Sequence, residues 1–111
     1  MTKPQGPKQP PPPSPPQARQ AFRETLLDPK GEFVATRHFT ERMRERRFDL
    51  ADVIQTARTG RIYNPPEWDT KHGEWTWRIE GKSLDGRAVY VVFSLLGKRR
   101  VKGITIETPK E

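Results

Sequence analysis

The chain has 111 residues and a formal net charge of +7 at pH 7, from 21 lysines and arginines against 14 aspartates and glutamates. It has no cysteine, so disulfides and thiolate metal sites are excluded, and no apolar run approaches the length of a membrane span. A chain of this size forms one small domain without room for a large cofactor-binding fold, and its charge favours a polyanionic partner, nucleic acid first and acidic protein second.

Residues 1–32 are predicted to be a disordered, proline-rich tail or linker. Residues 1–20, "MTKPQGPKQPPPPSPPQARQ", have no acidic side chain and hold eight of the twelve prolines. This composition favours extended polyproline conformations and supplies nothing to bury. A ligand for a proline-recognition domain is an alternative interpretation of the same residues. Residues 21–33 are expected to add only a short helical turn that stops at Asp28-Pro29 and Gly31.

The compact domain is expected over residues 33–111, and it opens with two helices. Thr36 is suited to cap a helix that runs to about Arg47. Asp49 is suited to cap a second helix, with an acidic side chain in its first turn and Gly60 after its end.

Beyond residue 60 the hydrophobic period changes from helical to two, which is typical of strands. Asp85-Gly86 and Gly97-Lys98 supply turns between the last three strands. The strands are expected at residues 61–66, 74–82, 87–96 and 100–108, with residues 67–73 as a loop. The predicted fold is α+β, with two N-terminal helices packed on a three- to four-stranded antiparallel sheet.

The first predicted helix carries a pattern of side chains suited to catalysis. Its sequence over residues 37–47, "RHFTERMRERR", holds one histidine and five arginines. His38, Arg42 and Arg46 are spaced four residues apart, so they share one side of the helix beside the apolar stripe of Phe39 and Met43. The helix start and Arg42 both disfavour an imidazolium, which suits His38 to act as a general base, and the arginines are suited to hold a phosphate. These are parts needed to cleave RNA through its own 2′-hydroxyl.

The predicted sheet can supply further parts. Arg78, Tyr90 and Thr105 are expected on the face opposite the helices, where Tyr90 or Arg78 would protonate the leaving oxygen. Trp68, in the loop, can stack on a base. The helix-covered face should hold Trp75, Trp77, Val89, Val91, Phe93, Ile104 and Ile106. Further positive charge for RNA binding is expected at one rim, from Lys98, Arg99, Arg100 and Lys102.

Each of these residues also has an ordinary structural interpretation. His38 can be a helix cap or a satisfied core group, and the arginines can pair with Glu45 or Asp49. The basic rim can be a solvated hairpin. His38 and His72 lack the spacing of a metal site, and neither a metal nor another cofactor is expected.

Two segments resemble the domain-of-unknown-function family 4258: "HFTERMRERRFDLADVIQTARTGRI" at residues 38–62 and "WTWRIEGKSLDGRAVYVVFSLLGKRRVKGITIE" at residues 75–107. The shared features are His-x3-Arg-x3-Arg on the first helix, Asp-Val and a terminal Gly in the second, a Gly-Arg before an aliphatic strand, and a closing Ile-Thr-Ile strand. That family resembles the wider barnase–EndoU–colicin–RelE group of metal-independent ribonuclease toxins. The resemblance implies roles for His38, Arg42, Arg46 and Thr105, and a cognate antitoxin or immunity protein as partner.

The sequence therefore predicts an endoribonuclease toxin domain that acts in the cytoplasm on messenger, transfer or ribosomal RNA, without contact with a membrane. It would belong to a toxin–antitoxin pair, or to a larger toxin that delivers it into a target cell. One alternative is a non-catalytic RNA- or ribosome-binding module with the same basic surface. Another is a module whose basic face binds an acidic protein.

Overall fold

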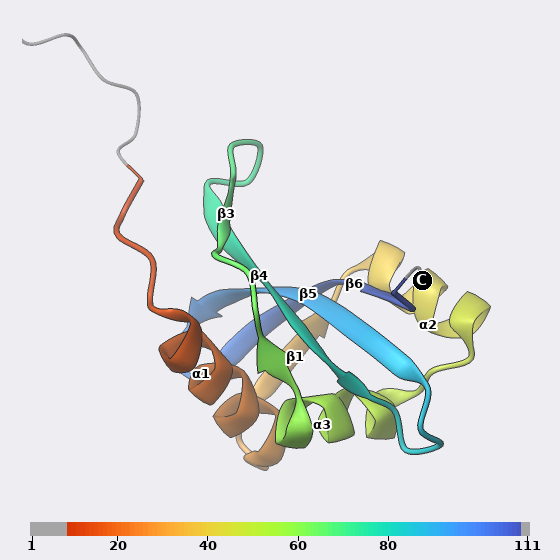
Figure 1. Cartoon of the computed structure of the whole chain (residues 1–111). Helices are drawn as coiled ribbons and strands as arrows, with labels where there is room; N and C mark the ends of the chain where they lie inside the picture. The colour runs from red at the N-terminus through yellow and green to blue at the C-terminus, as the bar shows by residue number, and fades with distance from the viewer. Residues whose placement is uncertain (1–8, 110–111) are drawn as a thin grey trace, which may run out of the picture.

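The computed structural model describes residues 9–109, which form three helices and a mixed sheet of six strands (Figure 1). The helices are α1 (Pro15–Leu27), α2 (Arg37–Arg46) and α3 (Leu50–Thr59). The strands are β1 (Glu32–Ala35), β2 (Arg61–Ile62), β3 (Glu67–Asp69), β4 (Glu74–Lys82), β5 (Ala88–Gly97) and β6 (Arg100–Glu107). They lie in the order β1-β6-β5-β4-β2, and β3 also pairs with β4.

The predicted α+β class is confirmed, and so are the two helices that follow residue 33. Thr36 caps α2, and Asp49 caps α3 through a capping box with Asp52. The sheet is larger than predicted and is not purely antiparallel, because β1 pairs in parallel with β6. Residues 67–69, which were expected in a loop, form β3 and pair with β4.

The disordered tail predicted for residues 1–32 is wrong for residues 15–27, which form α1; the part of that prediction on residues 1–8 lies outside the described residues. Ser14 begins the helix with a capping box, because its hydroxyl accepts from the Gln17 amide and its own amide donates to the Gln17 side chain. Pro15 and Pro16 fit the first turn, where amide hydrogens have no partner within the helix.

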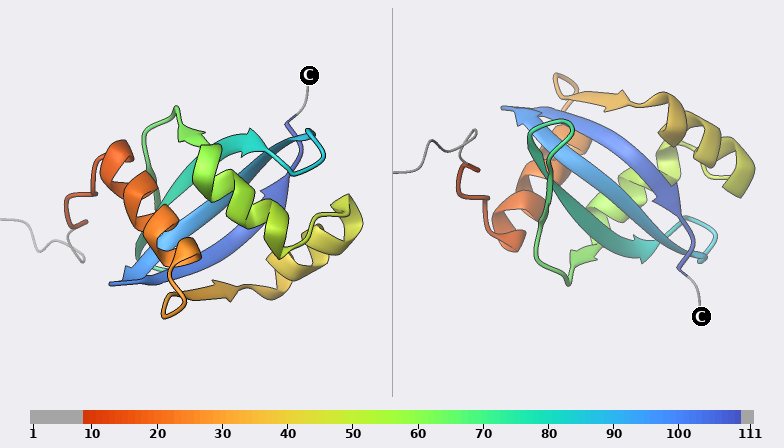
Figure 2. Two further views of the ribbon diagram at one scale, coloured as in Figure 1. Left: turned by 90° about the horizontal axis from the view of Figure 1, so that it is seen from below. Right: turned by 90° about the horizontal axis from the view of Figure 1, so that it is seen from above.

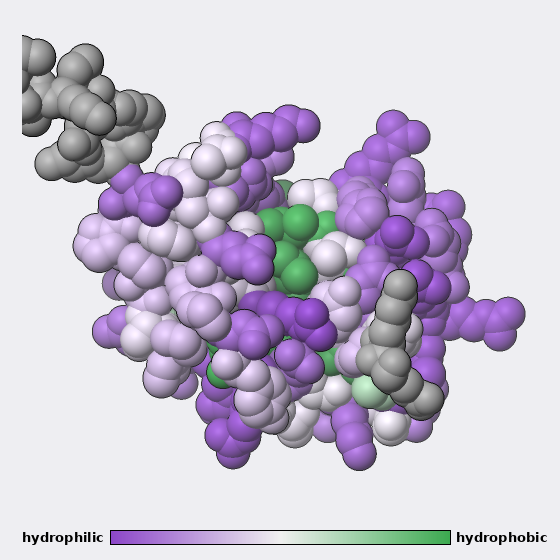
Figure 3. All heavy atoms as spheres, turned by 45° about the horizontal axis from the view of Figure 1, so that its top comes forward, coloured by the Kyte–Doolittle hydropathy of each residue, from purple (hydrophilic) through white to green (hydrophobic). Residues whose placement is uncertain are grey.

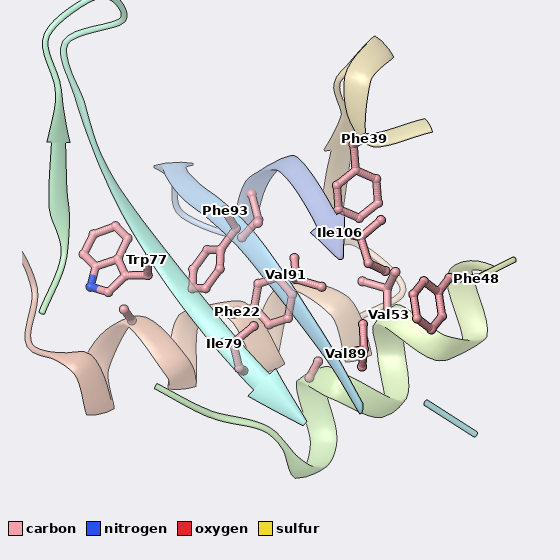
Figure 4. Packing of buried hydrophobic residues seen from close by; sticks show 13 residues of the cluster. Phe22, Phe39, Phe48, Val53, Trp77, Ile79, Val89, Val91, Phe93 and Ile106 are labelled. Carbon is pink, nitrogen blue, oxygen red and sulfur yellow. The ribbon is translucent and has the colours of Figure 1, made fainter. Parts of the chain in front are cut away.

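α1 belongs to the hydrophobic core. Its Ala18 and Phe22 are fully buried, and the Phe22 ring lies 4.4 Å from the ring of Phe93 on β5. Trp77 stacks on the same phenylalanine at 5.9 Å. α1 and α3 cover one face of the sheet, and no helix of the described residues covers the other face (Figure 2). Most of the core residues lie between these two helices and the sheet, and Phe39 lies between α2 and β6 (Figure 4).

A bulge in β6 decides which side chains reach the uncovered face. Val92 pairs with Thr105, but Phe93 pairs with Gly103, so Ile104 is an extra residue on β6. The extra residue reverses the alternation of side chains along β6. Before the bulge, residues 101 and 103 face the helices. After it, residue 106 faces the helices, and residues 105 and 107 point to the uncovered face. Ile104, predicted in the covered set, is therefore only partly buried.

Replacing Phe22 with alanine tests whether α1 is part of the cooperative unit. The Phe22→Ala change should lower the free energy of unfolding by about 3–5 kcal/mol, since a fully buried ring would leave a cavity against Phe93. The matched control is Leu27→Ala on the same helix, whose side chain is 42% exposed, with an expected loss below about 1 kcal/mol. Urea unfolding measures both, and equal losses would show that α1 does not dock.

Candidate functional site

The first turn of α2 is fixed against β6. Phe39 is fully buried over Gly103, where an added Cβ would lie 2.9 Å from the Phe39 ring and 2.4 Å from the ring of Phe33. The Thr36 hydroxyl accepts from the amide of Phe39 at 3.0 Å and donates to the carbonyl of Ile104 at 3.1 Å. α2 therefore lies beside the part of β6 that extends past its pairing with β1.

The last turn of α2 is held by an arginine from the turn before β5. Arg87 donates through its two terminal nitrogens to the carbonyls of Arg46 at 2.7 Å and Arg47 at 2.6 Å. A cation at this end of a helix also complements the helix dipole. Asp85 orients Arg87 at 2.9 Å, and the pKa of Asp85 is lowered by a hydrogen bond from Ser83 and then by Arg87. Both ends of α2 are thus tied to the sheet.

One carboxylate joins the two arginines that face the sheet edge. Glu107, the last residue of β6, accepts from Arg46 Nε at 3.2 Å, and its other oxygen lies 3.0 Å from Arg42 Nε. That second oxygen also accepts from the Thr105 hydroxyl at 3.0 Å. The Glu107 side chain is only 15% exposed. We call these four residues the Glu107 cluster.

A hollow on the uncovered face adjoins the Glu107 cluster. The guanidinium carbon of Arg78 lies 3.7 Å from the centre of the Tyr90 ring, and Tyr90 is the cross-strand neighbour of Glu107. Arg78, Tyr90 and Thr105 line this hollow of about 220 Å³, with Val92 beside them. Figure 3, which views this face obliquely, shows a small apolar patch surrounded by hydrophilic atoms. The three side chains share the face on which they were expected.

His38 lies one helical turn before Arg42 on α2, and it is exposed. The spacing of four residues puts it on the same side of the helix as Arg42 and Arg46. His38 therefore lies in one row with Arg42 and Arg46 along α2.

The predicted basic rim is not part of this site. The eight residues from Arg100 to Glu107 span about 23 Å along β6, so the rim lies at the opposite end of the strand. Three of its four side chains are neutralised locally, in the ion pairs Arg99–Asp28, Arg100–Glu32 and Lys102–Glu74.

Trp68 also lies away from the hollow. It is the cross-strand partner of Trp75, and the two rings meet edge to face at 5.1 Å. Because Trp75 precedes the buried Trp77 by two residues, both indoles lie on the helix side of the sheet, opposite Arg78. The expected stacking of Trp68 on a base would therefore take place on a different face from the hollow.

The second histidine lies in an exposed turn. His72 hydrogen-bonds Asp69 at 2.7 Å, and this contact is the main reason why the pKa of Asp69 is lowered. Within residues 9–109, no group of three or more His, Cys, Asp or Glu side chains is placed to hold a metal ion. No helix in the same range combines the length and apolarity needed to cross a membrane.

Residues 35–106 match the family model described as Domain of unknown function (DUF4258), and because the match covers most of the chain, the chain belongs to this family. This confirms the family that the sequence resembles. The matched region begins at the last residue of β1, so α1 precedes it. No curated protein and no solved structure matches the chain. The family description names no activity, and the wider grouping with ribonuclease toxins stays a prediction.

Sequence reasoning missed two residues that build the site. Glu107 follows the Ile-Thr-Ile motif directly, so the alternation of the last strand could have placed it beside Thr105 once the bulge was known. Arg87 was noted only as part of a Gly-Arg motif, and nothing in its local sequence indicates a contact with the end of α2.

Replacing Glu107 tests whether its carboxylate holds the site together. The Glu107→Gln change should lower the free energy of unfolding by about 2 kcal/mol at low salt, since it leaves two neighbouring arginines without their shared counter-charge. Glu45→Gln is the control, because Glu45 is 54% exposed and, among the described residues, pairs with Arg42 alone, and it should cost less than about 0.5 kcal/mol. Denaturant unfolding measures the loss of unfolding free energy in both variants. A loss in Glu107→Gln no larger than in Glu45→Gln would contradict the role of Glu107 in holding the site together.

Proposed function

We propose that this chain is a metal-independent endoribonuclease domain of the toxin type, which cleaves RNA by attack of a 2′-hydroxyl on the adjacent phosphate. The observation that carries the proposal is the meeting of two groups of side chains. The arginines of α2 converge on Glu107 and Thr105, and Thr105 also lines the hollow with Arg78 and Tyr90. Phosphate-binding groups therefore adjoin a surface suited to a nucleotide.

The two arginines keep donors for a phosphate. Both contact Glu107 through Nε, and Arg42 uses one terminal nitrogen to donate to Glu45 at 3.0 Å. Among the described residues, the terminal nitrogens of Arg46 donate no hydrogen bond. Glu107 therefore orients the guanidinium groups from one side, and a phosphate can bind from the other and have its developing charge stabilised there.

The proton transfers are assigned to groups on either side of this phosphate. His38, exposed on the same side of α2, takes the proton of the 2′-hydroxyl as its oxygen bonds to phosphorus. The bond from phosphorus to the 5′ oxygen breaks, and Tyr90 gives that oxygen a proton. Arg78 above the Tyr90 ring places positive charge beside the phenolate that remains. The products are a 2′,3′-cyclic phosphate and a 5′-hydroxyl.

The shape of the site favours a polymer over a small molecule. The hollow of about 220 Å³ is smaller than the roughly 300 Å³ at the lower end of small-molecule pockets, so a ligand would lie across it. A single strand of RNA suits such an open sheet face, with stacking and phosphate contacts supplied along it.

Because the same surface is exposed and basic on its α2 side, a cognate antitoxin or immunity protein with acidic side chains would cover it. Action in the cytoplasm on messenger, transfer or ribosomal RNA belongs to the same proposal.

The first test is cleavage of total RNA by purified protein in EDTA. The wild type should cleave and leave 2′,3′-cyclic phosphate ends, and His38→Ala should lower the rate by at least about 100-fold, the usual contribution of a general base. His72→Ala is the matched control, because this histidine lies in the exposed β3–β4 turn and should leave the rate unchanged. Intact RNA with folded wild type, or equal losses in the two variants, would contradict the proposal.

The second test separates phosphate binding from general charge. Arg46→Ala should weaken binding of a single-stranded oligonucleotide with 2′-deoxy substitution about tenfold or more, and should lower the salt dependence of the affinity. Arg37→Ala removes the same charge from the same helix, but its side chain is 94% exposed and lies outside the Glu107 cluster, so its effect should be small. Fluorescence anisotropy at several salt concentrations measures both. Equal effects would indicate non-specific attraction alone.

A non-catalytic RNA-binding module is the competing function, and the two tests distinguish it. It would show the difference between Arg46→Ala and Arg37→Ala without any cleavage in EDTA. Binding of an acidic protein, with no affinity for RNA at all, would instead favour the protein-interaction module.

A further inference from the structure

The segment that leads into α1 lies on an aromatic groove. The indole nitrogen of Trp75 donates to the carbonyl oxygen of Pro10 at 2.6 Å. Around this bond, a groove of about 240 Å³ is lined by the two indoles of Trp68 and Trp75 and by residues of the proline-rich segment, among them Pro11 and Pro13. We call it the tryptophan groove. Figure 1 shows this segment rising from the start of α1 on the side of the molecule where the β3–β4 hairpin also projects.

The chemistry of both partners fits recognition of a polyproline conformation. Residues 10–13 are four consecutive prolines, and each fixes φ near −65° and disfavours helix in the residue before it. Such a segment has no internal hydrogen bonds, so its carbonyl oxygens remain available to an outside donor. Aromatic grooves with a tryptophan N–H recognise proline-rich peptides in this way, with the flat rings against the pyrrolidines.

The fold brings the segment to the groove at small entropic cost. Ser14 caps α1 immediately after Pro13, and α1 is anchored by the buried Phe22. The proline-rich segment is thus fixed at Ser14, four residues after the Pro10 carbonyl that Trp75 contacts, which gives the segment a high effective concentration at the groove. The stiffness of consecutive prolines lowers the ordering cost further.

We propose that Trp68 and Trp75 form a recognition site for proline-rich segments in the polyproline conformation, and that residues 9–13 of the same chain are its ligand. This site is independent of the proposed ribonuclease function, since the two indoles lie on the sheet face opposite Arg78 and Tyr90. The segment carries the chain from the start of α1 to Trp75 and forms one side of the tryptophan groove.

The test follows the indole N–H signal of Trp75 by NMR in the full chain and in the triple variant Pro11→Ala, Pro12→Ala and Pro13→Ala. The signal is assigned with Trp75→Phe. In the triple variant it should move, and its hydrogen exchange should become about tenfold faster or more, as expected when a hydrogen bond to a docked segment opens. A peptide of sequence QPPPPS, added at millimolar concentration, should restore the original position. Pro29→Ala, an exposed proline at the other end of α1, should leave the signal unchanged.

Other outcomes would overturn the proposal. An unchanged Trp75 signal in the triple variant, with the fold retained by circular dichroism, would show that the segment does not dock. Protection that grows with the concentration of the full chain would assign the ligand to a second copy. Restoration by a single-stranded oligouridylate and not by the peptide would make the groove a site for bases.

Discussion

The contact of Phe39 with Gly103 decides where α2 can lie, and the rest of the site depends on it. A side chain at position 103 would meet the rings of Phe33 and Phe39, so only glycine lets the helix approach the strand this closely. The approach puts α2 at the edge of β6 and not on the helix-covered face. Arg42 and Arg46, on the side of α2 that faces β6, can then reach around the strand to the uncovered face. Without the contact, α2 would be an ordinary charged helix on the surface.

The bulge at Ile104 has a complementary effect on β6. It lets a single strand give apolar residues to the core on both sides of the irregularity and still direct Thr105 and Glu107 to the uncovered face. Bulges near functional sites commonly change the direction of side chains in this way. The helix supplies cations, the strand supplies a carboxylate and a hydroxyl, and the turn before β5 supplies the arginine that holds the end of the helix.

Elements with strong local signals could be predicted from the sequence, and contacts between distant residues could not. Asp49 with Asp52 and the alternation around Trp77 define α3 and β4. α1 was missed because the proline content outweighed the capping pair of Ser14 and Gln17, although that pair was present. The row of His38, Arg42 and Arg46 follows from helical spacing alone. The counter-ion of the two arginines, Glu107, is 61 residues from Arg46 in the sequence, and no local pattern indicates such a partner.

Because these contacts join residues far apart in the sequence, the order in which the chain leaves the ribosome decides when each contact can form. α1 is made first, yet at 13 residues it is too short to be stable alone, and its Phe22 must wait for Phe93. β1 likewise waits for the parallel strand that begins at Arg100. Contacts between such distant residues form slowly, because the chain between them must first be ordered. Glu107 is the last residue of β6, so a nascent chain has no assembled Glu107 cluster until the whole of β6 has been made.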